Sequence, residues 1–297
     1  MNGEATCIWP AEALLGEGPL WDTRLDRLYW VDIKGRKVMS CDAGGGARRE
    51  TLFDRQPGCL GLTADPARLV AAFDDGFHVI SEGSAQRAFI ADPEPNRPGN
   101  RFNDGKVAPD GAFWAGSMDD EEIKHTGSFY RLGADGAFAA IDRDYHITNG
   151  PAFAADGATI YLNDTGKQVI YAADLTADGI ANRRPHITFG AGDGYPDGMT
   201  IDVDGGLWVA FWGGWGVSRF DQAGRREEQV RLPVAQTTSV AFGGPDLATL
   251  YVTSARKGLG PDDLAAQPLA GGLFSLDAGR RGRPEPLFAG GPGLING

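Results

Sequence analysis

Oxygen-bearing side chains at three bends of the chain are the residues best suited to do chemistry. They are Glu17 in "LGEGPLW", Asn149 in "TNGPAF" and Asp197 in "YPDGMT". Two carboxylates and an amide oxygen suit a hard divalent cation if the fold brings them together. The alternative is that glycine-rich and proline-rich turns use these side chains to bind their own backbone. The three motifs alone leave both interpretations open.

Several other signatures of chemistry fail on their spacing. "GNRFNDGK" has five residues between its glycines and lacks the Ser or Thr after the lysine, so it is no phosphate-binding loop. "TIDVDGG" resembles part of a calcium loop, but its twelfth position is Phe211 rather than glutamate, which favours a turn between strands. The four histidines show no paired ligand spacing. A serine hydrolase triad or a histidine-rich zinc site is therefore not expected.

The positions of these residues depend on a repeat that runs along the chain. Short apolar runs follow turn signals at intervals of about 41 to 47 residues, a period in the forties that is typical of β-propeller blades. The runs are marked by Leu28, Leu69, Phe113, Ile160, Leu207 and Leu250. The sequence thus predicts an all-β, six-bladed propeller, in which equivalent loops of distant repeats meet around one axis.

We expect residues 1–297 to form this propeller as a single domain. The segment 5–9 is expected to pair with residues 271–276 or with residues 285–290, so that the two ends of the chain complete one blade. Helical periodicity is almost absent, apart from one turn predicted at 261–267.

Composition restricts the class of partner. A net charge of −12 with no clustered Lys/Arg stripe argues against nucleic acid, so small molecules are the expected partners. No apolar run approaches the roughly 18 residues of a membrane span, and the start of the chain lacks the pattern of a secretory signal. Three widely spaced cysteines indicate neither a disulfide framework nor a zinc site. We expect a cytoplasmic protein without membrane or nucleic-acid partners, for which a monomer is compatible with the sequence.

Five motifs together resemble the senescence marker protein, gluconolactonase and regucalcin-like family, in the same order and over nearly the whole chain. They are "LGEGPLW", "NRFNDGKVAPDGAFWAGSM", "TNGPAF", "YPDGMTIDVDGGLWVA" and "FGGPDLATLYVTSARKGL". The resemblance implies a six-bladed propeller that hydrolyses sugar lactones, with one divalent metal ion at the centre of one face. Calcium, zinc, manganese, magnesium and iron(II) all remain candidates for that ion.

The resemblance also implies roles for individual residues. Glu17, Asn149 and Asp197 match the metal ligands, and Asp197 also matches the proposed general base. Residues that match the substrate contacts are Arg101, Asn103 and Glu121. Glu121 lies among neighbouring acids, Asp119, Asp120 and Glu122, to which this assignment could move.

Three further residues have two interpretations each. Trp212 and Trp215 in "FWGGWG" either stack on a sugar ring or pack between blades. His146, which departs from the family motif, either contributes to the rim of the site or is a hydrogen-bonded loop residue. Two other functions also stay open, a calcium-binding regulatory protein without lactone turnover and a propeller that serves as a protein-binding platform.

Overall fold

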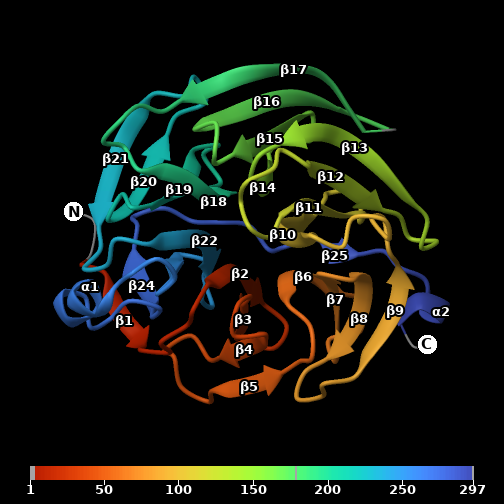
Figure 1. The fold of residues 1–297 in the computed structure, drawn as a ribbon, viewed down its shortest axis with the longest axis horizontal. Helices are drawn as coiled ribbons and strands as arrows, with labels where there is room; N and C mark the ends of the chain where they lie inside the picture. Colours follow the sequence, from red (N-terminus) through yellow and green to blue (C-terminus); the bar gives the residue numbers. More distant parts are fainter. Residues whose placement is uncertain (1–3, 178, 296–297) are drawn as a thin grey trace.

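The computed structural model describes residues 4–177 and 179–295, and their strands form six twisted sheets around an axis (Figure 1). The innermost strands of neighbouring sheets contact one another all the way around the ring. The predicted six-bladed β-propeller is therefore confirmed. In the first three blades the strands are, for blade 1, β2 (Gly16–Asp22), β3 (Arg27–Asp32), β4 (Lys37–Cys41) and β5 (Arg49–Leu52); for blade 2, β6 (Pro57–Thr63), β7 (Arg68–Phe73), β8 (Gly76–Ser81) and β9 (Arg87–Ala91); and for blade 3, β10 (Asn100–Val107), β11 (Phe113–Asp119), β12 (Gly127–Leu132) and β13 (Phe138–Tyr145).

The other three blades repeat this antiparallel order, and the last one is completed by the start of the chain. They are, for blade 4, β14 (Thr148–Phe153), β15 (Thr159–Asp164), β16 (Val169–Thr176) and β17 (Gly179–Thr188); for blade 5, β18 (Tyr195–Ile201), β19 (Leu207–Trp212), β20 (Gly216–Phe220) and β21 (Arg226–Arg231); and for blade 6, β22 (Thr237–Gly243), β23 (Thr249–Ser254), β24 (Leu273–Asp277) and β1 (Thr6–Trp9). In blade 6, Thr6 pairs with Ser275, which confirms the first of the two pairings expected for the ends of the chain. Helix α1 (Pro261–Ala266) lies where the single helical turn was predicted.

The hydrophobic core lies between adjacent blades. Clusters of buried side chains combine residues of neighbouring sheets, such as Leu20 of β2 with Leu60 of β6. Aromatic rings bridge other blade pairs: Trp21 stacks on Tyr251 at 5.8 Å between ring centroids, and Phe77 packs against Phe102 at 5.0 Å. The three cysteines are free. No helix within the described residues is long and apolar enough to cross a membrane.

The regularly spaced runs of the sequence are the second strand of each blade, and not the innermost one. The innermost strands are less regular, because the antiparallel ladder of every one shifts register near its start, for example between Glu17 and Leu20 and between Pro196 and Met199. Such a bulge leaves residues unpaired and turns their side chains away from the usual alternation. It follows that the first residues of the innermost strands can direct side chains toward the axis.

The C-terminal segment crosses the end of the ring that lies opposite to the starts of the innermost strands. It runs from β24 through the middle of the propeller to β25 (Leu287–Phe288) and helix α2 (Pro292–Ile295), drawn in blue in Figure 1. β25 pairs in parallel with the innermost strand β6, and the carbonyl of Gly111 accepts a hydrogen bond from the backbone N–H of Ala289. Residues 285–290 thus join blade 2 instead of the last blade, which was their alternative placement.

Candidate functional site

A cavity of about 490 Å³ opens where the innermost strands begin. Its lining combines the first residues of strands from four blades with loop residues of others. Five of the six residues singled out in the sequence line it, namely Glu17, Arg101, Asn103, Asn149 and Asp197. The structure thus brings together bends that lie up to 180 residues apart in the chain, as a propeller permits. We call this cavity the upper pocket.

The irregular starts of the innermost strands place the three oxygen ligands. Glu17 and Asn149 are each the last residue in register before the ladder shifts, and Asp197 lies inside the shift between Pro196 and Met199. All three side chains are at least 95% buried with respect to bulk solvent, and all three border the pocket. Their side chains are therefore accessible to a ligand in the pocket but hardly to bulk solvent.

A chain of hydrogen bonds fixes the amide of Asn149. The Arg101 guanidinium donates to Asn103 Oδ1 at 2.6 Å, and Asn103 Nδ2 donates to Asn149 Oδ1 at 3.0 Å. Asn149 Nδ2 then donates to Thr165 Oγ1 at 2.8 Å, and the Thr165 hydroxyl donates to the carbonyl of Pro196 at 2.6 Å. The chain links blades 3, 4 and 5 and ends on the residue before Asp197. It leaves the second lone pair of Asn149 Oδ1 for another partner.

The buried carboxylates at the upper pocket repel one another when they are ionised. Burial raises the pKa of Glu17 and of Asp197 well above their usual range, and nearby carboxylates add to this effect. Burial also raises the pKa of Asp104 to about 6, against the hydrogen bonds that its carboxylate accepts from the N–H groups of Gly150 and Gly105. A positive charge placed between Glu17 and Asp197 would reverse this penalty.

The donor set of the upper pocket fits a divalent metal ion. Among the described residues, no group of three or more His, Cys, Asp and Glu side chains is arranged to hold a metal. The upper pocket offers a different set of donors, with two acids, Glu17 and Asp197, and one amide, Asn149. The Glu17 carboxylate accepts a hydrogen bond only from the adjacent N–H of Gly18, at 3.2 Å, within the part of the chain that the structure describes. Its remaining lone pairs are free for a hard cation.

The acidic loop at residues 119–122 contributes Glu122, and not Glu121, to the lining of the upper pocket. Glu121 is exposed and does not line the pocket, whereas its neighbour Glu122 does and forms an ion pair with Lys257. Asp120 instead pairs with Arg101, whose Nε lies 2.6 Å from Asp120 Oδ1. The assignment of an acid in this loop to the substrate therefore fits Glu122 better than Glu121.

The residues left with two interpretations are placed as follows. Trp212 lines the upper pocket, whereas Trp215 is 40% exposed and lies outside its lining. His146 also lines the pocket, and its Nε2 lies 2.8 Å from the carbonyl oxygen of Glu122, so it is a rim residue and a hydrogen-bonded one at once. Its ring stacks on His125 with centroids 4.4 Å apart.

Two polar residues of the site were missed in the sequence. Thr165 is part of the hydrogen-bond chain, and Asn163 Nδ2 donates to the carbonyl of Asp197 at 2.9 Å, so both hold the strand that carries Asp197. Both lie in "NDT", at the end of β15 and just beyond it. A polar triplet directly after the apolar strand "TIYL" was the available signal.

Comparison with known proteins identifies the family of the chain. Residues 15–256 match the family model described as SMP-30/Gluconolactonase/LRE-like region. The chain is 33% identical to 6-deoxy-6-sulfogluconolactonase of Pseudomonas putida over 98% of this chain and all of that protein. It is 36% identical to L-arabinolactonase of Azospirillum brasilense, over 98% of this chain and 97% of the relative.

A solved structure shares the whole architecture. The crystal structure of a calcium-binding protein, regucalcin, from Agrobacterium tumefaciens superposes with a TM-score of 0.91 at 31% identity, covering 96% of this chain and 97% of that one. The family match and the relatives extend over the blades that carry Glu17, Asn149 and Asp197. The chain belongs to the SMP-30/gluconolactonase/LRE-like family.

Proposed function

We propose that the protein hydrolyses sugar lactones to aldonic acids with one divalent metal ion held by Glu17, Asn149 and Asp197. The observation that carries the proposal is the pairing of two buried carboxylates, whose pKa values are raised, with an oriented amide in one pocket. The names of the relatives, a sulfogluconolactonase and an arabinolactonase, supply the substrate class.

Opening a lactone ring requires a polarised carbonyl, an activated water and stabilisation of the charge that develops on oxygen. A bound divalent cation supplies Lewis acidity for the carbonyl and lowers the pKa of water. Asp197 is the residue proposed to accept the proton of the attacking water, since its carboxylate borders the pocket and no side chain of opposite charge bonds to it among the described residues. The network through Asn149 and Thr165 ends on the carbonyl of Pro196 and so holds the backbone next to Asp197 in place.

Arg101 is the residue proposed to orient the substrate. Its Nε and Nη1 atoms are used by Asp120, Asn103 and the carbonyl of Phe102, so Nη2 is the donor left without a partner among the described residues. A guanidinium held on two sides presents that donor in a fixed direction. Glu122 and Lys257, which also line the upper pocket, are proposed to interact with sugar hydroxyls: Glu122 accepts hydrogen bonds from them and Lys257 donates hydrogen bonds to them.

The direct test is a panel of aldonolactones against metal-stripped protein refilled with calcium, magnesium, manganese, zinc or iron(II). We expect turnover of at least one lactone that depends on the added ion. Tight calcium binding without turnover of any lactone would instead support a calcium-binding regulatory function, since the related regucalcin of Agrobacterium tumefaciens is named as a calcium-binding protein.

Replacing Arg101 by alanine should lower kcat/KM for the best lactone by about tenfold to a hundredfold, the equivalent of one hydrogen bond from a charged donor. Metal affinity should change little, because Arg101 bonds to Asn103 and not to a proposed ligand. Steady-state kinetics and metal titration measure the two effects. Arg97→Ala is the matched control, since Arg97 lies just before the same strand but outside the pocket lining. Loss of the metal in Arg101→Ala would contradict the division of roles.

Replacing Thr165 by valine should lower kcat by about tenfold with little change in KM. The substitution keeps the shape of the side chain but removes the hydroxyl that accepts from Asn149 and donates to the carbonyl of Pro196. Thr165→Ser restores the hydroxyl and should recover most of the rate. If serine and valine variants are equally slow, the methyl packing of Thr165 matters and the hydrogen bonds do not.

A further inference from the structure

A second cavity lies at the other end of the innermost strands. It has a volume of about 260 Å³ and is lined by the last residues of β10 and β14, the end of β18, and residues 282–286 of the crossing C-terminal segment. We call it the C-terminal cavity. The two cavities are distinct because they use opposite ends of the same strands: Asn103 lines the upper pocket and Lys106 the C-terminal cavity, both from β10. The function proposed above uses none of the residues that line the C-terminal cavity.

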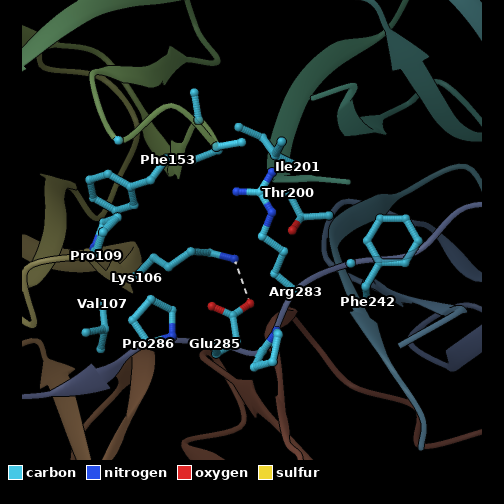
Figure 2. Close-up of a pocket in the computed structure, with 16 residues that line it drawn as sticks. Lys106, Val107, Pro109, Phe153, Thr200, Ile201, Phe242, Arg283, Glu285 and Pro286 are labelled. Atoms are coloured by element: carbon cyan, nitrogen blue, oxygen red, sulfur yellow. Dashed lines mark hydrogen bonds and ion pairs between the residues drawn. The ribbon is translucent and has the colours of Figure 1, made fainter. Parts of the chain in front are cut away.

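Two cations point into the C-terminal cavity from different sides. Figure 2 shows Lys106 extending from the innermost strand of blade 3 and Arg283 extending from the C-terminal segment into the same space. Lys106 Nζ lies 3.2 Å from Glu285 Oε1, whereas the Arg283 guanidinium has no hydrogen-bond or ion-pair partner among the described residues. The charged lining therefore carries a net charge of +1, two cations against one carboxylate, in a chain whose net charge is −12.

The rest of the C-terminal cavity is mostly apolar. Val107, Phe153 and Ile201 line it, together with prolines on either side of Glu285 (Figure 2). The hydroxyl of Thr200 adds one neutral polar group, which has no hydrogen-bond partner among residues 4–177 and 179–295. Apolar walls with a few convergent polar groups are typical of small-molecule sites. Inorganic anions would leave these apolar walls without contact.

We propose that the C-terminal cavity binds a small organic carboxylate, with its carboxylate between Arg283 and Lys106 and its apolar body against Phe153 and Ile201. A guanidinium offers two parallel N–H donors that match both oxygens of a carboxylate. Lys106 can contribute by exchanging its contact with Glu285 for the ligand. Binding fastens the C-terminal segment, which carries Arg283, to the innermost strand of blade 3, which carries Lys106.

The test is calorimetric titration of the full-length protein with benzoate at low ionic strength. Wild-type protein should bind benzoate, and Arg283→Gln should weaken the affinity by at least about tenfold because it removes the charged fork. Arg281→Gln is the matched control. Arg281 lies two residues away on the same segment and is exposed, as Arg283 is, but it does not line the cavity, so affinity should stay at the wild-type value.

A second variant should change the affinity in the opposite direction. Glu285→Gln removes the only carboxylate among the described residues that line the cavity and frees Lys106, so benzoate should bind several-fold more tightly. A purely structural effect of substitutions in this segment would weaken binding in both variants. Inorganic phosphate should bind more weakly than benzoate, since it cannot use the apolar walls.

Four outcomes would overturn the proposal. They are absence of benzoate binding to the wild-type protein, unchanged affinity in Arg283→Gln, weaker binding in Glu285→Gln, and phosphate binding as tight as that of benzoate. Arg101→Ala distinguishes the two cavities: if it abolishes benzoate binding while Arg283→Gln does not, the ligand lies in the upper pocket. These results are independent of whether any lactone is hydrolysed.

Discussion

Asp197→Asn is expected to give a folded protein that turns over its best sugar lactone at least about a hundredfold more slowly than the wild type. A positioned general base contributes about a hundredfold to ten-thousandfold, and an amide cannot accept the proton of the attacking water. The amide keeps the size of the side chain and an oxygen that can face a metal ion. The hydrogen bond from Asn163 to the backbone carbonyl of residue 197 does not involve the substituted side chain, so the strand should stay in place.

The free energy of unfolding distinguishes a catalytic role of Asp197 from a structural role in the turn. Burial and the neighbouring carboxylates raise the pKa of Asp197, so an uncharged residue should be tolerated or should stabilise the metal-free protein. A turn residue that binds its backbone would instead cost about 1 kcal/mol of unfolding free energy when it is removed. Chemical denaturation of metal-free wild type, Asp197→Asn and Asp197→Ala measures this difference.

Asp193→Asn is the control for substitution in this loop. Asp193 lies four residues earlier, pairs with Arg226 at 2.9 Å and does not line the upper pocket. Its variant should keep wild-type turnover. Wild-type turnover in Asp197→Asn would show that Asp197 is not the base, and "YPDGMT" would then be a turn motif only.

Removal of divalent cations is expected to abolish lactone hydrolysis, and refilling with a suitable cation should restore it. Glu17 and Asp197 are both buried, and the charge of Asp197 adds to the rise in the pKa of Glu17. The two cationic side chains of the pocket, Arg101 and Lys257, are already paired with Asp120 and Glu122. Neither can therefore take over the charge of the ion. Assays after exhaustive chelation, followed by readdition of each cation, measure this dependence.

Thermal stability gives a second measurement that does not depend on catalysis. A cation that binds only the folded protein adds about 2.7 kcal/mol at a concentration a hundred times its Kd, so the melting temperature should rise with added cation. Glu17→Gln with Asp197→Asn removes both negative charges, and this double variant should lose the shift. Full turnover by protein from which all metal has been removed would refute the proposed mechanism.

The propeller was predictable because the second strand of each blade is regular. β3, β7, β11, β15, β19 and β23 each follow a turn signal and contain a run of apolar residues, at intervals set by the size of a blade. The innermost strands were harder to recognise, because the register shift near the start of each one breaks the alternation on which strand prediction depends. Glu17, Asn149 and Asp197, which the sequence placed at bends, therefore lie on the strands β2, β14 and β18.

The candidate site was predictable only in part, for a related reason. Turn chemistry and family motifs singled out Glu17, Asn149 and Asp197, which the structure places around one pocket. Asn163, Thr165 and Lys257 were missed because each acts across blades, and such contacts have no fixed spacing in the sequence. Glu121 was predicted to contact the substrate, but its neighbour Glu122 lines the pocket. The two acids are adjacent in one short loop, and the sequence does not show which of them faces the pocket.

The pairing between β1 and β24 has a consequence for the way the chain reaches its native state. Thr6 pairs with Ser275, so β1 can pair with β24 only after the 269 residues that follow Thr6 up to Ser275 have been synthesised. Contacts of such sequence separation form late and slowly. During translation blades 1 to 5 can assemble while blade 6 still presents the open edge of a sheet, a stage at which such edges invite aggregation. We therefore expect ring closure to be the last and slowest step of folding, and chaperones to be needed most at this stage.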